Sequence, residues 1–94
     1  MTTKILEPQS FTTQQQVMHY ASELMTMVRT RHADAQFHGP TYWPSEQLWV
    51  IDAFFDQGED FELQAQLSER ETDILLVEGL WLCVLPKPLS FYVQ

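Results

Sequence analysis

The sequence predicts a small, mostly α-helical domain: a bundle of about three helices with extended termini. Two features of the composition favour helices over a many-stranded sheet. The chain contains three Gly and no Asn, although these residues supply the positive φ angles of tight β-hairpins. Residues that lose little entropy on entering a helix, namely Gln, Glu, Leu, Met and Ala, are abundant instead. The alternative is an α+β fold in which an N-terminal helix packs on a small antiparallel sheet.

The length indicates one domain over residues 1–94. A chain of 94 residues buries only about 60–65% of its unfolded surface, which is too little for two cores. Within this domain we expect residues 1–11 to form an extended lead-in and residues 86–94 to form a Pro-containing C-terminal tail.

The sequence predicts a cytoplasmic protein. Glu7 and Pro8 stand where a signal peptide needs an apolar centre. The longest nearly uncharged run, Gly79 to Pro86, is far shorter than a membrane span. The single Cys83 has no partner for an internal disulfide, which fits a reducing compartment, and we expect it to be a small buried apolar residue.

The first helix is predicted to begin at Thr12 or Thr13, where the spacing to Gln15 or Gln16 fits a capping box. The Gly39-Pro40 pair is expected to stop it. Its apolar stripe repeats at steps of four, three and four residues through Val17, Ala21, Leu24 and Val28.

The second segment, residues 45–58, is predicted as a helix with Ser45 as its N-cap and Gly58 at its end. Leu48, Ile51 and Phe55 keep helical spacing. The segment is nevertheless apolar nearly all round, so a buried strand is the alternative. We interpret residues 41–44 as a connector that precedes this helix.

The third segment runs from Asp60 to Trp81. A capping box at Ser68 to Glu71 allows either one continuous helix or two helices that meet at Ser68. The alternative is a set of short strands over residues 61–67, 74–77 and 81–85. The tail after Pro88 is expected to be either an edge strand or an apolar strap across the helices. A heptad-like stripe with one Arg in it runs through Leu63, Leu67, Arg70, Ile74, Val77 and Trp81.

The run Leu67 to Glu71, with Ile74-Leu75 and Glu78-Gly79-Leu80, resembles the opening of the helix-turn-helix domain of LuxR-type regulators over about fourteen residues. Trp81 to Val84 then stand where that domain has a polar turn and a basic recognition helix. We therefore interpret the match as a shared capping box and assign no family.

The sequence predicts no catalytic residue, no metal site and no cofactor, so we expect a protein that is not an enzyme. His32, Asp34 and His38 are the only candidate metal ligands, and they flank a helix end without a fourth ligand nearby. Asp52 and Asp56 would share a face if their segment were helical, but no matching pair accompanies them. Gly-rich phosphate loops, nucleophile elbows and Cys pairs are absent from the sequence.

The acidic residues give the main functional clue. Of the thirteen Asp and Glu residues, eleven lie between Asp34 and Glu78, where Arg70 is the only Lys or Arg. Such a surface attracts cationic partners and repels nucleic acid. We therefore predict a small acidic protein that inhibits or escorts a basic partner protein, as an immunity protein, an inhibitor or a chaperone does, without binding nucleic acid or membranes directly. The predicted partner-binding residues are Asp52, Asp56, Glu59, Asp60, Glu62, Glu69, Glu71 and Asp73, with Tyr42, Trp43 and Trp49 as aromatic anchors.

Two further hypotheses follow from the same residues. Mimicry of nucleic acid requires Asp52, Asp56, Glu59 and Asp60 to lie beside the acids of the third segment, because duplex DNA carries about one charge per 1.7 Å. A structural homodimer, whose acidity only confers solubility, is the alternative function. Arg70 favours such a dimer, because an Arg at a core-like position needs an acid to offset its desolvation and a second copy is one source.

Overall fold

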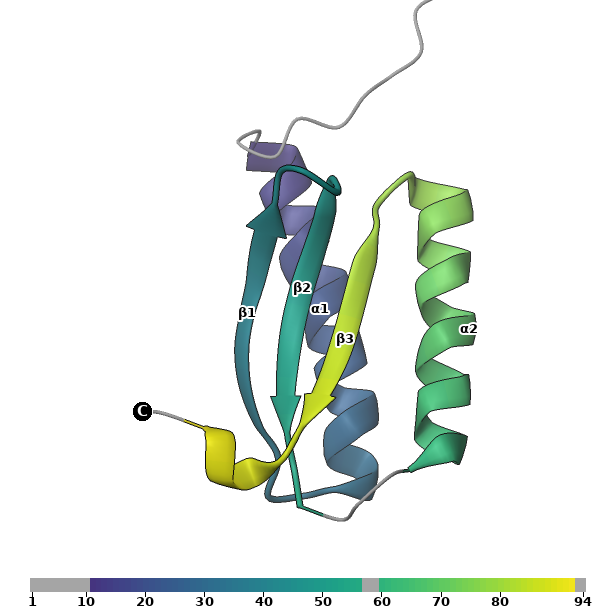
Figure 1. Cartoon of the computed structure of the whole chain (residues 1–94). Helices are drawn as coiled ribbons and strands as arrows, with labels where there is room; N and C mark the ends of the chain where they lie inside the picture. Colours follow the sequence, from purple (N-terminus) through teal and green to yellow (C-terminus); the bar gives the residue numbers. More distant parts are fainter. Residues whose placement is uncertain (1–10, 57–59, 93–94) are drawn as a thin grey trace, which may run out of the picture.

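The computed structural model describes residues 11–56 and 60–92, with side chains from Thr13 onward. The chain folds in the order α1 (Phe11–Arg31), β1 (Gln36–Trp43), β2 (Leu48–Phe54), α2 (Phe61–Glu78), β3 (Leu82–Lys87) and a short 3₁₀ turn, η1 (Leu89–Phe91) (Figure 1). The three strands form one sheet in the order β1-β2-β3. β1 and β2 are antiparallel, whereas β2 and β3 are parallel and are joined by α2.

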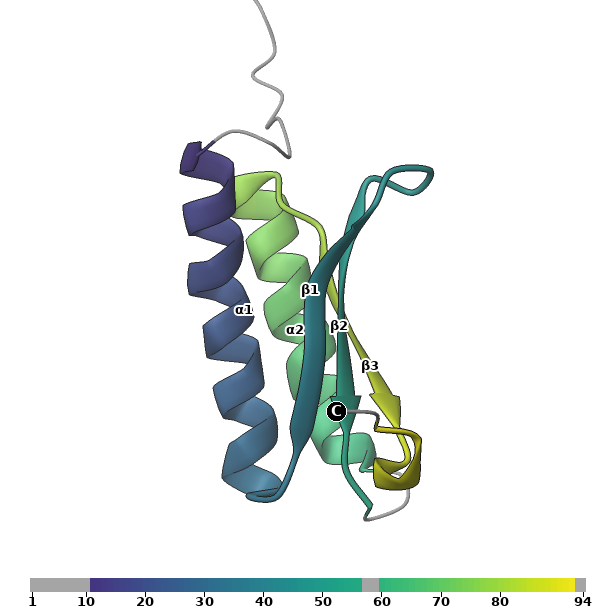
Figure 2. The same cartoon turned by 90° about the vertical axis from the view of Figure 1, so that its left-hand side faces the viewer.

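The fold has two layers. Both helices lie on one face of the sheet and leave its other face without a helix (Figure 2). The prediction of a helical bundle is therefore wrong: the domain is α+β, with two helices on a three-stranded mixed sheet. The α+β alternative had the N-terminal helix on a sheet, but it had neither the second helix nor the parallel pair. No helix within the described part of the chain is long and apolar enough to cross a membrane.

The stripe predicted for the first helix is confirmed. Val17, Ala21, Leu24 and Val28 are all buried in the core between α1, α2 and the sheet. The helix ends at Arg31, earlier than predicted, and Gly39-Pro40 lies inside β1 rather than at a helix end. There it interrupts the pairing with β2 between His38 and Thr41, as a bulge does.

The second segment is a strand, so the predicted helix with Ser45 as its cap is wrong. Ser45 lies in the turn between β1 and β2. The segment is apolar nearly all round because β2 is the central strand and is buried on both faces. Ile51 and Ala53 point into the helix-covered core, whereas Val50 and Phe54, which are also buried, alternate to the opposite face.

The third segment is one helix, and no break occurs at Ser68. The Asp60 side chain caps α2 by accepting a hydrogen bond from the Leu63 N–H, and Gly79 ends the helix in the left-handed conformation. Leu63, Leu67 and Ile74 of the predicted stripe are buried. The strands proposed within residues 61–77 are therefore wrong, whereas the strand proposed near residues 81–85 exists as β3.

The sheet face opposite the helices is partly covered by the tail. Tyr92, which follows η1, packs against Phe54 and His38, with ring centroids 5.2 and 4.9 Å apart. The tail thus lies across the helix-free face of the sheet, so both predicted alternatives, an edge strand and an apolar strap across the helices, are wrong. Residues 1–10 of the predicted lead-in lie outside the described residues.

Candidate partner-binding surface

The predicted acidic residues do not form one continuous patch. Asp52 lies on the helix-free face of the sheet, where its Oδ1 is 3.0 Å from Nζ of Lys87. β3 separates β2 from α2 in the view of Figure 1. Asp52 therefore does not lie beside the acids of α2, as the hypothesis of nucleic-acid mimicry expected of it. Asp56 is exposed just beyond β2, and Glu59 lies outside the described residues.

Asp60 is a structural residue. Its two carboxylate oxygens accept hydrogen bonds from Nε and Nη2 of Arg31 at 2.7 and 3.0 Å. Nε2 of His32 lies 2.9 Å from the same carboxylate, and the Asp60 side chain is 12% exposed. The Arg31 guanidinium, together with the Leu63 N–H, holds the pKa of Asp60 far below its usual range. Asp60 therefore joins the end of α1 to the start of α2 and has little charge left for a partner.

Glu71 is also a structural residue. It is half-buried, and its Oε2 accepts a hydrogen bond from the Val84 N–H on β3 at 3.1 Å. Burial raises the pKa of this carboxyl, and the hydrogen bond from Val84 only partly opposes that effect. The side chain satisfies a backbone donor on an edge strand, which leaves it poorly placed to steer a partner.

Glu71→Gln should raise the melting temperature at pH 7 by roughly 2–4 °C. The folded-state pKa lies above the ordinary 4.5, so Glu71 favours folding most below pH 4.5, where it is protonated, and loses that contribution as pH rises through the folded pKa. Gln keeps the acceptor for Val84 and removes the buried charge. Thermal melts at pH 7 and pH 4 test this, because the advantage should vanish at pH 4. A lower melting temperature than wild type at pH 7 would show that the charge itself stabilises the fold. Glu69→Gln, which removes an exposed charge from the same helix, is the matched control.

The outward side of α2 is the strongest candidate surface. Glu62, Glu69 and Asp73 are all exposed there, and no described cation pairs with Glu69 or Asp73. Glu62 has only Nη1 of Arg31 at 3.7 Å. Large apolar side chains stand on the same helix at both ends: Phe61 is 70% exposed and Leu76 is 77% exposed.

These residues lie on one side of α2 because of helical spacing. Steps of four, seven and four residues from Phe61 lead through Ala65 and Thr72 to Leu76, which places all four within one narrow stripe. The Thr72 hydroxyl donates to the Ser68 carbonyl at 2.8 Å, so this hydroxyl is satisfied within the helix. We call this stripe, together with Glu62, Glu69 and Asp73, the outer face of α2.

The predicted aromatic anchors divide between the two faces of the sheet. Trp49 packs against the core, and its ring lies 5.0 Å from that of Tyr42, which is half-buried on the same side. Trp43 is 42% exposed and belongs to β1 rather than to a connector. Of the three anchors, the structure leaves Trp43 the most accessible.

Several exposed apolar residues were not predicted. Leu76, Val77 and Trp81 are all strongly exposed, although the heptad-like stripe placed Val77 and Trp81 in the core. The helix ends at Glu78, so Trp81 lies outside the helical period that the stripe assumes. The sequence does contain a signal for Leu76: the run Leu75-Leu76-Val77 is apolar on adjacent residues, which one buried face of a helix cannot absorb.

Arg70 finds its acid within the same chain. It forms a two-point ion pair with Glu23 of α1, in which Nη2 lies 3.0 Å from Oε1 and Nε contacts Oε2. The acid comes from α1 and not from a second copy, so Arg70 gives no argument for a dimer. The pair joins α1 to α2 and lowers the pKa of Glu23 through the hydrogen bond from Arg70.

The candidate ligands for metal or acid-base chemistry are not brought together. His32 pairs with Asp60 and stacks on Phe55, whereas His38 lies on the opposite face of the sheet beside Phe54. Asp52 belongs to a strand, so it shares no helical face with Asp56. In residues 11–56 and 60–92, no three His, Cys, Asp or Glu side chains are grouped so as to hold a metal ion. Burial and the nearby Glu71 raise the pKa of Cys83, so its thiol is not activated as a nucleophile.

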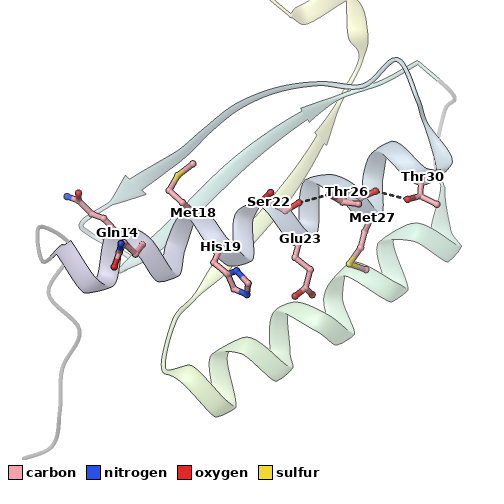
Figure 3. A pocket seen from close by; sticks show the side chains of 9 residues that line it. Gln14, Met18, His19, Ser22, Glu23, Thr26, Met27 and Thr30 are labelled. Atoms are coloured by element: carbon pink, nitrogen blue, oxygen red, sulfur yellow. Dashed lines mark hydrogen bonds between the residues drawn. The ribbon is translucent and has the colours of Figure 1, made fainter.

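A groove of about 960 Å³ runs along the exposed side of α1, and all nine residues that line it come from this one helix (Figure 3). His19, Glu23 and Met27 point toward α2, whereas Met18 points toward the strands. The hydroxyls of Thr26 and Thr30 donate to backbone carbonyls four residues earlier in the helix. The described lining residues come from α1 alone, and the one carboxylate among them, Glu23, is already paired with Arg70 of α2, so these residues lack the convergent free polar groups of a catalytic or ligand site.

Function must therefore be argued from these surfaces, because comparison of the chain with protein-family models, with curated proteins and with solved structures finds no match.

Proposed function

We propose that this chain is a non-enzymatic binding protein that inhibits or escorts a basic partner protein, and that the outer face of α2 is its docking surface. The observation that supports this proposal is the combination of acid and exposed apolar side chains on one helix. Neither Glu69 nor Asp73 forms an ion pair with a described cation, and along the helix they lie between Phe61 and Leu76, which are more than two-thirds exposed. Arg70, which interacts electrostatically with Asp73, makes its two-point pair with Glu23 instead.

The apolar part of this face would supply the binding energy. Phe61 and Leu76 lie fifteen residues apart on α2, or roughly 22 Å at 1.5 Å rise per residue, which is the length of a helix docked in a groove. Large exposed apolar side chains at such spacing are costly in water and are typical of interaction sites. Leu76, at the end of the face, is the best candidate for an anchor.

The acidic part of this face would select the partner. Charge complementarity at the rim of an interface mainly accelerates association and excludes partners of the wrong sign. A partner that presents Lys or Arg beside an apolar groove therefore matches the outer face of α2. Nucleic acid does not, because its phosphates would meet Glu69 and Asp73.

Charge reversal on this helix tests the proposal. The wild type, Glu69→Lys/Asp73→Lys and the control Asp34→Lys/Glu46→Lys are each immobilised and exposed to extract of the source cell at low salt. The two double variants change the net charge equally, and the control residues are exposed outside α2. We expect the wild type to retain a strongly basic protein that elutes as salt rises, the control to retain it, and the α2 variant to retain at least about tenfold less.

The retained protein is then purified, and its affinity for each variant is measured by calorimetry. Leu76→Ser should weaken binding by at least about tenfold as well, because an apolar anchor is lost. Equal capture by both double variants would contradict the proposed surface. Equal loss in both would show that only the overall charge matters, and retention of acidic proteins would contradict the proposed partner class.

A further inference from the structure

The helix-free face of the sheet ends in an exposed aromatic row. Trp43 of β1 pairs with Leu48 of β2, so their side chains lie on the same face. Trp81 stands between Leu80 and Leu82, which are both buried in the helix-covered core, so its side chain turns to the opposite face. Extending the β2–β3 register by one residue places Trp81 beside Leu48. The row Trp43-Leu48-Trp81 thus crosses β1 and β2 and ends at the residue just before β3.

This row is uncovered, unlike the other end of the same face. Near the end of β2, Tyr92 packs on Phe54 and leaves it 3% exposed. At the aromatic row no described residue has a comparable role, and Trp43 and Trp81 remain 42% and 46% exposed. Val50 on the same face is only 2% exposed, so the incomplete part of this layer is limited to the two half-exposed Trp side chains, and a sheet face of this kind is normally covered by a second element.

We propose that a second copy of this chain covers this face, so that two sheets pack face to face about a two-fold axis with their aromatic rows in the interface. The near-neutral charge of this face is the reason to expect a second copy there. The strands of the face carry one acid and one base, Asp52 and Lys87, which pair with each other at 3.0 Å. A chain with a net charge of −8 repels its own copies least where its surface is locally neutral. A basic partner would gain no complementary charge here, whereas it would on the outer face of α2.

The size of the face predicts a weak, reversible dimer. Three strands about 4.8 Å apart and seven residues of about 3.4 Å rise give a patch of roughly 15 by 25 Å. This footprint is less than half of the roughly 800 Å² per partner of a stable interface, and Tyr92 already covers one end of it. The dissociation constant should therefore be about 100 μM or higher. Since both helices lie on the other side of the sheet, the dimer leaves the outer face of α2 free (Figure 2). The proposal therefore does not depend on the proposed function.

Sedimentation equilibrium of the full chain, from about 1 to 500 μM, tests the proposal. We expect a monomer–dimer equilibrium that is unchanged or tighter at high salt, because screening weakens the repulsion between two acidic chains. Trp43→Ser/Trp81→Ser should raise the dissociation constant at least about tenfold. Leu76→Ser, which removes an even more exposed apolar side chain from α2, should leave it within about twofold.

A second variant guards against misfolding of the Trp double variant. Thr41→Lys changes an exposed polar residue of β1 that pairs with Val50 on the same face. It should also dissociate the dimer, because the interface would bury an unpaired charge. This effect opposes the weaker repulsion expected from a lower net negative charge. A wild type that stays monomeric throughout the range would overturn the proposal, as would a dimer that persists in both face variants. Loss of the dimer only in Leu76→Ser would show that the copies meet through α2, and would overturn the proposal too. Failure of partner capture leaves these outcomes unaffected, because the two proposals use different faces.

Discussion

Gly39→Ala should destabilise the fold by about 3 kcal/mol, although it adds only one methyl group. Gly39 has φ of 103°, a backbone conformation that residues with a Cβ rarely adopt. A Cβ at this position would lie 2.5 Å from the Val50 carbonyl oxygen and 3.0 Å from the Thr41 N. Both contacts are with backbone atoms, so the clash is relieved only if β1 moves away from β2. We expect a large loss in the free energy of unfolding measured in urea.

Gly79→Ala is the matched control. Gly79 also has positive φ, at 67°, but a Cβ there would meet no atom within 4 Å. The cost should therefore be that of a left-handed residue alone, about 1–2 kcal/mol. Similar losses in the two variants would contradict the close approach of β1 and β2 at the bulge. The comparison also tests whether Gly39-Pro40 lies inside a strand, because a Gly at a helix end, as the sequence predicted, should behave as Gly79 does.

The two helices could be predicted from the sequence because their signals are local. In α1 the apolar residues repeat with the period of a helix, and all four residues of the predicted stripe are buried. In α2 the predicted residues Leu63, Leu67 and Ile74 are buried as well, although the cap at Asp60 and the end at Gly79 were not predicted. Local signals are not sufficient alone, because a cap and helical spacing also predicted a helix over residues 45–58, where β2 lies.

The sheet could not be predicted, because the argument against it rested on turn residues that this topology does not need. Only β1 and β2 are joined by a hairpin, and there Gln47 adopts φ of 54° in place of Gly or Asn. β2 and β3 are parallel, so α2 connects them and no tight turn is required. A scarcity of Gly and Asn therefore limits the number of hairpins and does not exclude a sheet.

The candidate site was predicted only in part, because the neutralisation of each acid is decided by the tertiary structure. Asp60 meets Arg31 across 29 residues, and Lys87 reaches Asp52 from another strand. Glu69 and Asp73 keep their predicted exposure because α2 presents them opposite Leu63 and Leu67. Glu69 and Asp73 thus lie on the outer face of α2, whereas the helix-free face of the sheet is nearly neutral. Partner binding and dimerisation are therefore proposed for two different surfaces.

Asp60→Ala should be the most destabilising change among the acidic residues, with a melting temperature lower by roughly 10 °C. The substitution removes the N-cap of α2 and the two-point pair with Arg31 at once. It also leaves Nε2 of the buried His32 without its carboxylate. Asp56→Asn, at an exposed acid near the same end of the sheet, should have almost no effect and serves as the control.

Acid titration separates the charge of Asp60 from its capping role. Its folded-state pKa is lowered, so its contribution is complete above the ordinary value of 3.8 and is lost as pH falls below that value toward the folded pKa. Asp60→Asn keeps a side chain that caps helices equally well but removes the charge. We therefore expect Asp60→Asn to be intermediate at pH 7 and to approach wild type as the pH falls from about 4 to 2. A difference between the two proteins that stays constant over this range would show that it does not arise from the charge of Asp60, and would contradict a stabilising ion pair with Arg31.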